Sequence, residues 1–180
     1  MLDGSIVSGA SDLFAAHAAG SPADDGAGPL PRAELRDAAA TLRYMLAGQA
    51  IVTFESAKTG THFTYRISAA DKPAATAPRV RPVSHFVAVL TAPETFVYLG
   101  LVREAGACYE HGRKSRVGSA APSAQAFAWV WARLQEGRMP STLAVYHEGR
   151  CGACGRRLTT PESVASGLGP ICAKRAGGAS

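Results

Sequence analysis

The hydrophobic and polar positions follow a helical period near the start of the chain and a strand period after it. Residues 32–46, RAELRDAAATLRYML, repeat apolar side chains at helical spacing, with Pro31 before them and Gly48 beyond. Proline favours the start of a helix, and glycine favours its end. The apolar stripe consists of Leu35, Ala38, Ala39, Leu42, Met45 and Leu46. We therefore predict a helix from Arg32 to Leu46 that packs through this stripe.

Between residues 50 and 111 the pattern changes to short β-branched and aromatic runs with some alternation, which is typical of strands. The runs are AIVTFES at 50–56, HFTYRIS at 62–68, HFVAVLT at 85–91, TFVYLGLV at 95–102 and the shorter ACYEH at 107–111. KTGT at 58–61 is typical of a hairpin turn. We predict an antiparallel sheet of four or five strands. Phe63, Tyr65 and Tyr98 are assigned to its core, although outward-facing rings there would stack nucleic-acid bases.

A second helix is predicted for residues 122–136, PSAQAFAWVWARLQE, because Pro122 suits a first turn and Gly137 a helix end. Its apolar face consists of Phe127, Val130, Trp131 and Leu134. That face is expected to pack across the sheet. Trp129 lies off the stripe, and we expect it to make a second packing contact, with a binding aromatic as the alternative. One sheet with helices packed against it predicts an α+β fold.

Composition divides the chain into three parts. Residues 1–30 are rich in Ala, Gly, Ser, Asp and Pro, which predicts a disordered tail. Residues 31–140 hold the predicted helices and sheet as an α+β domain, with an exposed, proline-rich loop, DKPAATAPRVRPVS, at 71–84. Residues 141–176 contain three of the four cysteines and are predicted to form a zinc-finger module. The chain shows neither a secretory signal nor an apolar run long enough to span a bilayer, so we expect a cytoplasmic protein without membrane contact.

The C-terminal segment HEGRCGACGRRLTTPESVASGLGPIC, residues 147–172, places a CxxC pair ahead of a lone cysteine. A cytoplasmic chain rarely keeps disulfides, and redox CxxC pairs lie in a βαβ setting that this segment lacks. Three thiolates at this spacing suit a tetrahedral Zn²⁺ ion. We therefore predict Cys151, Cys154 and Cys172 as zinc ligands.

His147 is the predicted fourth ligand, which gives the arrangement H-x3-C-x2-C-x17-C. Cys108 is the first alternative and His111 the second. Proline and glycine positions around residues 160–170 predict a short helix and then a final helix with Cys172 in its first turn, as in a treble-clef-like zinc finger. Four protein ligands leave no position for water, so we expect a structural site and not a catalytic one.

Charge is spread unevenly over the chain. The net charge is +5, but residues 38–180 carry 17 basic and 8 acidic groups, a net charge of +9. Such an excess suits an anionic partner such as nucleic acid. The candidate phosphate-binding residues form a basic turn before the second helix and a group around the cysteines. They are Arg113, Lys114 and Arg116 in the turn, and Arg150, Arg156, Arg157, Lys174 and Arg175 in the module.

The cysteine segment resembles a small Cys/His module of phage and mobile-element proteins, which are grouped as a domain of unknown function. The family pattern is approximately H-x-G-x-C-x-x-C-G-R-x-L-T-x-P-E-S-[IV]-x-x-G-[IL]-G-P-x-C. The match runs through His147, Gly149, Cys151, Cys154, Gly155, Arg156, Leu158, Thr159, Pro161, Glu162, Ser163, Gly167, Gly169, Pro170 and Cys172. The resemblance implies zinc binding and a phage or mobile-element setting, and it implies no reaction.

No phosphate-binding P-loop, dinucleotide fingerprint, nucleophile elbow or catalytic triad is present in the sequence. We therefore expect a zinc-binding and nucleic-acid-binding accessory protein that is not an enzyme, with the choice between DNA and RNA left open. The alternative is a protein-interaction module that binds a host, defence or nucleoprotein-complex component through the zinc finger.

Overall fold

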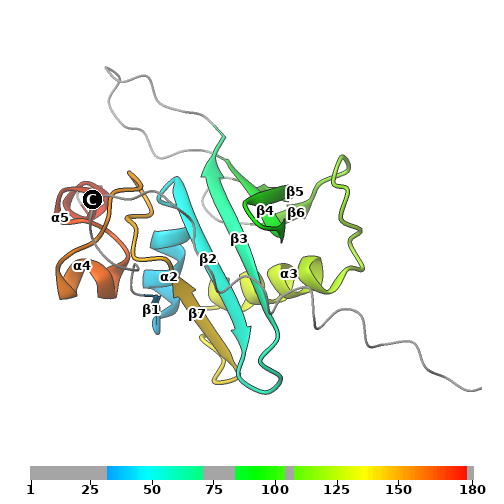
Figure 1. Ribbon diagram of the computed structural model, residues 1–180, viewed down its shortest axis with the longest axis horizontal. Coiled ribbons are helices and arrows are strands. Elements are labelled where there is room, and N and C mark those ends of the chain that lie inside the picture. Colours follow the sequence, from blue (N-terminus) through cyan, green and yellow to red (C-terminus); the bar gives the residue numbers. More distant parts are fainter. Residues whose placement is uncertain (1–31, 71–83, 104–107, 178–180) are drawn as a thin grey trace, which may run out of the picture.

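The computed structural model describes residues 32–70, 84–103 and 108–177, and its main element is an antiparallel sheet (Figure 1). Its seven strands are β1 (Ala33–Glu34), β2 (Gln49–Ser56), β3 (His62–Ala69), β4 (His85–Ala92), β5 (Thr95–Val102), β6 (Tyr109–His111) and β7 (Leu143–His147). Their order across the sheet is β1-β7-β2-β3-β4-β5-β6. The five runs predicted from the sequence are β2 to β6, and each pairs with the next along the chain.

Strands β1 and β7 raise the count above the four or five that the sequence pattern predicts. β7 lies between β1 and β2, with Val52 of β2 opposite His147 and Ala33 of β1 opposite the same residue. These pairings join segments far apart in the sequence, so no local pattern reveals them. The first residues of the predicted zinc-finger module therefore form part of the main sheet.

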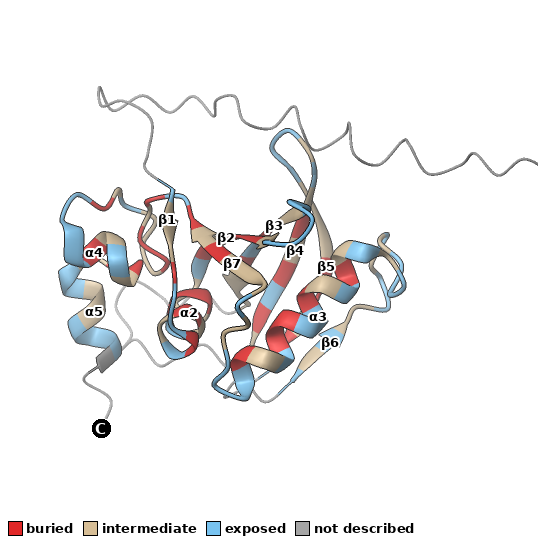
Figure 2. Ribbon diagram, turned by 90° about the horizontal axis from the view of Figure 1, so that it is seen from below, coloured by how far each residue is buried: buried red, intermediate tan, exposed pale blue. Residues whose placement is uncertain are grey.

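Two helices, α2 (Ala38–Met45) and α3 (Pro122–Gln135), pack on the same face of the sheet (Figure 2). Alternate strand residues point toward them and are buried, such as Val52, Tyr65 and Val87. From the helices, the buried residues of this core include Ala38, Tyr44, Met45, Ala124, Phe127, Val130, Trp131 and Leu134. The expected α+β packing of a helix across the sheet is confirmed.

Helix α2 begins at Ala38 and not at Arg32 as the apolar spacing predicts. The Asp37 carboxylate accepts a hydrogen bond from the Ala40 backbone N–H at 2.7 Å and caps the helix. An aspartate at this position satisfies an otherwise unpaired backbone donor. The residues before it, Ala33 and Glu34, pair with β7 instead.

Helix α3 follows its prediction, because Phe127, Val130, Trp131 and Leu134 are all buried. Trp129 differs from the expectation of a packing contact, since 46% of it is exposed. The predicted tail at 1–30 and residues 71–83 of the predicted loop lie outside the described residues.

Candidate metal centre and basic surfaces

Three cysteines from two separate segments meet beside the end of β7. The sulfur atoms of Cys151, Cys154 and Cys172 all lie within 4.8 Å of one another. Cys151 is buried and the other two are half-buried. The juxtaposition predicted from the CxxC pair and the lone cysteine is thus present, and these three thiols form a group that could hold a metal ion.

Local structure explains how the chain returns to the CxxC turn. Cys151 and Cys154 lie in a tight turn, closed by a bond from the Gly155 N–H to the Cys151 carbonyl at 2.8 Å. Helix α4 (Pro161–Ser166) begins at the Thr160 side-chain cap and ends at Gly167, which has a φ of 70°. Helix α5 (Pro170–Gly177) follows at once and carries Cys172 in its first turn. The predicted short helices are therefore present.

The thiols differ in their electrostatic surroundings. Burial alone would raise the pKa of Cys151, but the backbone N–H groups of Gly169, Ala153 and Cys154 point at its sulfur and together lower that pKa. The Gly169 nitrogen lies 3.4 Å from this sulfur. Burial and the neighbouring sulfur of Cys151 raise the pKa of Cys172 to about 12. Three thiolates so close together repel one another, and a bound cation would relieve that repulsion.

His147 is fully buried, but its ring is engaged elsewhere. Its Nε2 lies 2.7 Å from the Val164 carbonyl oxygen, and its Nδ1 accepts a hydrogen bond from the Gly149 N–H at 3.1 Å. Burial lowers the pKa of the imidazole, although the Val164 carbonyl opposes this shift. Both ring nitrogens thus have backbone partners, and the structure does not bring His147 into the sulfur group. Its role as the fourth zinc ligand stays a prediction.

The alternative ligands also lie apart from the sulfur group. Cys108, the first alternative, is exposed next to β6. The His111 ring contacts the Val117 carbonyl at 3.0 Å through Nε2. Within the described ranges, no fourth His, Cys, Asp or Glu side chain joins the three cysteines.

Tyr44 of α2 packs against the cysteine segment. Its ring lies against Gly152 and Gly167, where an added Cβ would come within 2.7 Å and 2.4 Å of its Cδ2 atom. The ring also lies 5.2 Å from the His147 ring between centroids. In addition, the Gln49 N–H of β2 donates to the Gly152 carbonyl at 2.6 Å. The cysteine segment is therefore docked on α2 and β2. The sequence pattern did not single out Tyr44, because its role depends on contacts with residues more than a hundred positions away.

The docked segment matches a family found by comparison with known proteins. Residues 141–177 match a family of unknown function, DUF6011. The DUF6011 segment comprises β7, the CxxC turn, α4 and α5, and therefore contains all three clustered thiols. No curated protein and no solved structure matches the chain. Among the described residues, no helix has the length and apolar character needed to cross a membrane.

The predicted basic turn lies at the edge of the sheet far from the DUF6011 segment. Arg113, Lys114 and Arg116 are exposed between β6 and the start of α3. The loop is held in place by Ser115, whose hydroxyl lies 2.8 Å from the Tyr98 carbonyl and accepts a bond from the Val117 N–H. Strand order and Figure 1 place this loop and α5 at opposite ends of the sheet. The two predicted basic groups therefore form separate surfaces.

The five basic residues of the DUF6011 segment differ in exposure. Arg156, Lys174 and Arg175 are exposed. Arg150 and Arg157 are half-buried, and the Arg150 guanidinium donates to the Gly155 carbonyl at 3.3 Å. The first three are thus better placed to meet a partner.

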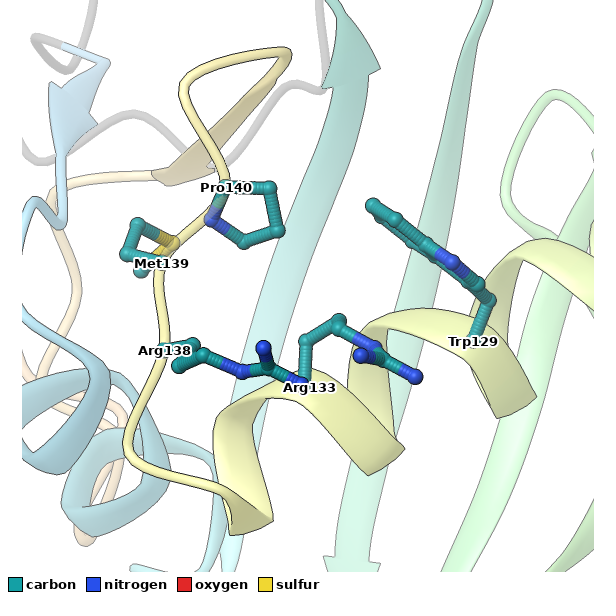
Figure 3. A pocket seen from close by; sticks show the side chains of 5 residues that line it. All are labelled: Trp129, Arg133, Arg138, Met139 and Pro140. Atoms are coloured by element: carbon teal, nitrogen blue, oxygen red, sulfur yellow. The ribbon is translucent and has the colours of Figure 1, made fainter.

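An open groove of about 500 Å³ lies beside α3 (Figure 3). Trp129 and Arg133 approach it from the helix, and Arg138, Met139 and Pro140 approach it from the connection to β7. The Glu136 carboxylate forms ion pairs with Arg133, at 3.0 Å, and with Arg138. The groove thus combines one exposed ring with two arginines that share one carboxylate, a feature that the sequence pattern did not indicate.

Proposed function

We propose that this protein binds one zinc ion in a structural site and binds nucleic acid through its exposed basic loop, without catalysing a reaction itself. The grouping of the three thiols carries the zinc proposal, and the fixed, exposed loop at Arg113–Arg116 carries the nucleic-acid proposal. The resemblance of the cysteine segment to phage and mobile-element modules supports an accessory role in such a setting.

The thiol group suits zinc on three grounds. A Zn–S bond of about 2.3 Å in tetrahedral geometry separates two ligand sulfurs by about 3.8 Å, and the three sulfurs lie within 4.8 Å of one another. Soft thiolates select zinc over the hard cations that prefer oxygen. The backbone N–H groups at Cys151 stabilise its thiolate form. Cys151, Cys154 and Cys172 would hold the ion, which would fix the CxxC turn to α5.

The exposed loop suits phosphate for two reasons. Its three cationic side chains reach solvent from a backbone that Ser115 and His111 fix to neighbouring segments. The loop also leads to the N-terminus of α3, where Ala121 offers no side-chain cap and backbone N–H groups favour an anion. The exposed Arg156, Lys174 and Arg175 offer a second contact for a long strand.

The loop can be tested by replacing Arg113, Lys114 and Arg116 together by alanine. Binding of a labelled single-stranded oligonucleotide should weaken, and the slope of log affinity against log salt should fall by about two, because each lost phosphate contact contributes about 0.7. Fluorescence anisotropy at several salt concentrations measures both quantities. The three side chains are exposed, so the fold should persist.

A matched control removes the same charge elsewhere, from the exposed residues Arg36, Arg43 and Lys58. This control should bind nearly as wild type does. If both triple variants lost the same affinity for the oligonucleotide, the loss would reflect only the overall charge of the protein. Wild-type affinity in the loop variant would overturn the assignment of the loop.

Exposed apolar side chains favour a second candidate function, the binding of a partner protein. Ile171 on α5 is 62% exposed within the DUF6011 segment, and Trp129 is 46% exposed at the groove beside α3. Apolar contacts of this kind would persist at high salt, whereas phosphate contacts would not. Salt dependence of the interaction therefore separates the two functions.

A further inference from the structure

The face of the sheet opposite α2 and α3 carries aromatic side chains from two adjacent strands. Phe86 of β4 is 44% exposed, while its neighbour Val87 is buried against the helices. Phe96 and Tyr98 of β5 are half-buried and lie opposite Leu90 and Ala88 of β4. In contrast, Phe63 and Tyr65 of β3 face the helix side, as the sequence pattern predicts. The same prediction is wrong for Tyr98, which lies on the open face because its register on β5 places it beside Phe86.

The aromatic residues form one connected group with an arginine. The Phe86 and Tyr98 rings meet edge to face, with centroids 6.1 Å apart. The Arg66 guanidinium of β3 lies over the Phe96 ring, 3.8 Å from its centroid. Phe96 and Tyr98 are two residues apart on one strand, so their side chains stand about 7 Å apart on the same face. The group thus offers adjacent ring faces with a cation among them.

This aromatic group continues into the basic loop. The Tyr98 ring lies so close to Gly112 that an added Cβ there would come within 2.3 Å of it. Arg113 and Lys114 follow Gly112 directly. The Ser115 hydroxyl, 2.8 Å from the Tyr98 carbonyl, holds the loop beside the same strand. The aromatic group and the cationic side chains of the loop are therefore contiguous beside Tyr98.

Three acidic side chains near this face are opposed by arginines, whereas Glu94, exposed in the turn between β4 and β5, has no ion pair among the described residues. Glu110 of β6 pairs with Arg103 at 3.0 Å, and Glu55 of β2 lies 3.8 Å from Arg32. Glu148, which follows β7, is within electrostatic reach of arginines that include Arg66. A polyanion would therefore meet little uncompensated negative charge between the rings and the loop.

We propose that this face binds single-stranded nucleic acid, with bases stacked on Phe86, on Tyr98 and on the Arg66 guanidinium that covers Phe96, and with phosphates held by the Arg113–Arg116 loop. The inference rests on the proposed nucleic-acid binding and adds the class of substrate. Bases of any sequence present a π-face to aromatic and guanidinium groups, and only unpaired bases are free to do so. A duplex would meet the loop through its phosphates and leave the rings uncovered.

Replacement of Phe86 by alanine tests the stacking surface. The affinity for labelled oligothymidine and oligouridine of about 12 nucleotides should fall by about tenfold or more. The affinity for duplex DNA, which is lower in the wild-type protein, should not change. Phe86→Trp should restore single-strand binding, because it restores a ring. Thermal melting of each variant checks that the fold is retained.

The control is Trp129→Ala, which removes a ring of similar exposure from α3 on the other side of the sheet, and it should bind as wild type does. The stacking surface would be overturned if Phe86→Ala left the affinity for single strands unchanged. It would also be overturned if Trp129→Ala reduced that affinity as much as Phe86→Ala does. Loss of binding in the loop triple variant with no loss in Phe86→Ala would retain the proposed function and reject only this inference. A wild-type protein that binds no oligonucleotide would reject both.

Discussion

At the scale of single residues, Tyr44 does most to join the cysteine segment to the rest of the molecule. Its ring covers Gly152 and Gly167 and approaches the His147 ring. Its hydroxyl lies 3.2 Å from the Ile51 carbonyl and 3.4 Å from the Arg150 carbonyl. Burial raises the pKa of this phenol well above its usual range, so the hydroxyl stays a hydrogen-bond donor. The two glycines are required because any side chain there would displace the ring.

Gly167→Ala should destabilise the protein by about 2–4 kcal/mol, because a side chain at positive φ costs about 1–2 kcal/mol and overpacking costs a similar amount. Urea denaturation followed by circular dichroism measures the loss. Gly137 has almost the same backbone, with φ of 69°, but nothing lies within 4 Å of its missing Cβ. Gly137→Ala should therefore cost only about 1–2 kcal/mol. Equal costs at the two positions would contradict the role given to the Tyr44 ring.

At the scale of elements, the boundaries of α2 show how a local cap can override apolar spacing. The stripe starts at Leu35, which is buried although it lies outside the helix. Its N–H donates to the Val145 carbonyl of β7 at 2.8 Å, so its backbone belongs to the extended segment beside β7. Asp37 then starts the helix by bonding the Ala40 N–H. Leu35 thus reaches the core from an extended segment, and apolar spacing alone cannot distinguish this from a helical turn.

Asp37→Ala should lower the free energy of unfolding by about 1 kcal/mol, which is typical of losing a helix N-cap. Chemical denaturation measures this change. Asp37→Asn should retain most of the stability, because an amide oxygen can also accept the Ala40 N–H bond. A helix that began at Arg32 would place Asp37 in its interior, and alanine there would then stabilise the protein instead.

At the scale of the whole molecule, a metal ion would connect the segment that follows β7 to the last helix, α5, beside the β1 edge of the sheet. Cys151 and Cys154 follow β7, which pairs with β1 and β2, and Cys172 lies on the last helix. The small apolar cluster around them contains only Cys151, Leu158 and Leu168 as fully buried members among the described residues. So small a core gives little stability by itself, and the ion should supply much of it.

The purified protein should contain about one zinc ion per chain, measured by elemental analysis. Serine at Cys151, Cys154 or Cys172 should remove it, whereas Cys108→Ser, at an exposed thiol outside the group, should not. Removal of the metal by a chelator should lower the melting temperature by about 10 °C. At this chain length, each 1 kcal/mol lost from the free energy of unfolding lowers the melting temperature by about 2–4 °C. Zinc retained in the Cys151 variant would contradict the site.

His147→Ala belongs to the same experiment and decides the fourth ligand. The sequence spacing predicts a fall in zinc affinity, measured by competition with a chromophoric chelator. The hydrogen bonds of the ring to Val164 and Gly149 predict a loss of stability with zinc affinity unchanged. The two outcomes are distinct because the first changes metal binding and the second changes unfolding of the metal-loaded protein.

The sequence by itself determined the elements whose signals are local: strands β2 to β6, helix α3 with its buried face, the caps of α4, and three cysteines at ligand spacing. Period, caps and turn residues act over a few positions, so they can be read directly. Only the tertiary structure decided that β7 joins the sheet, that the His147 ring meets backbone groups, and that Tyr98 and Phe86 share the open face. These depend on pairing and packing between distant segments, which local patterns do not encode.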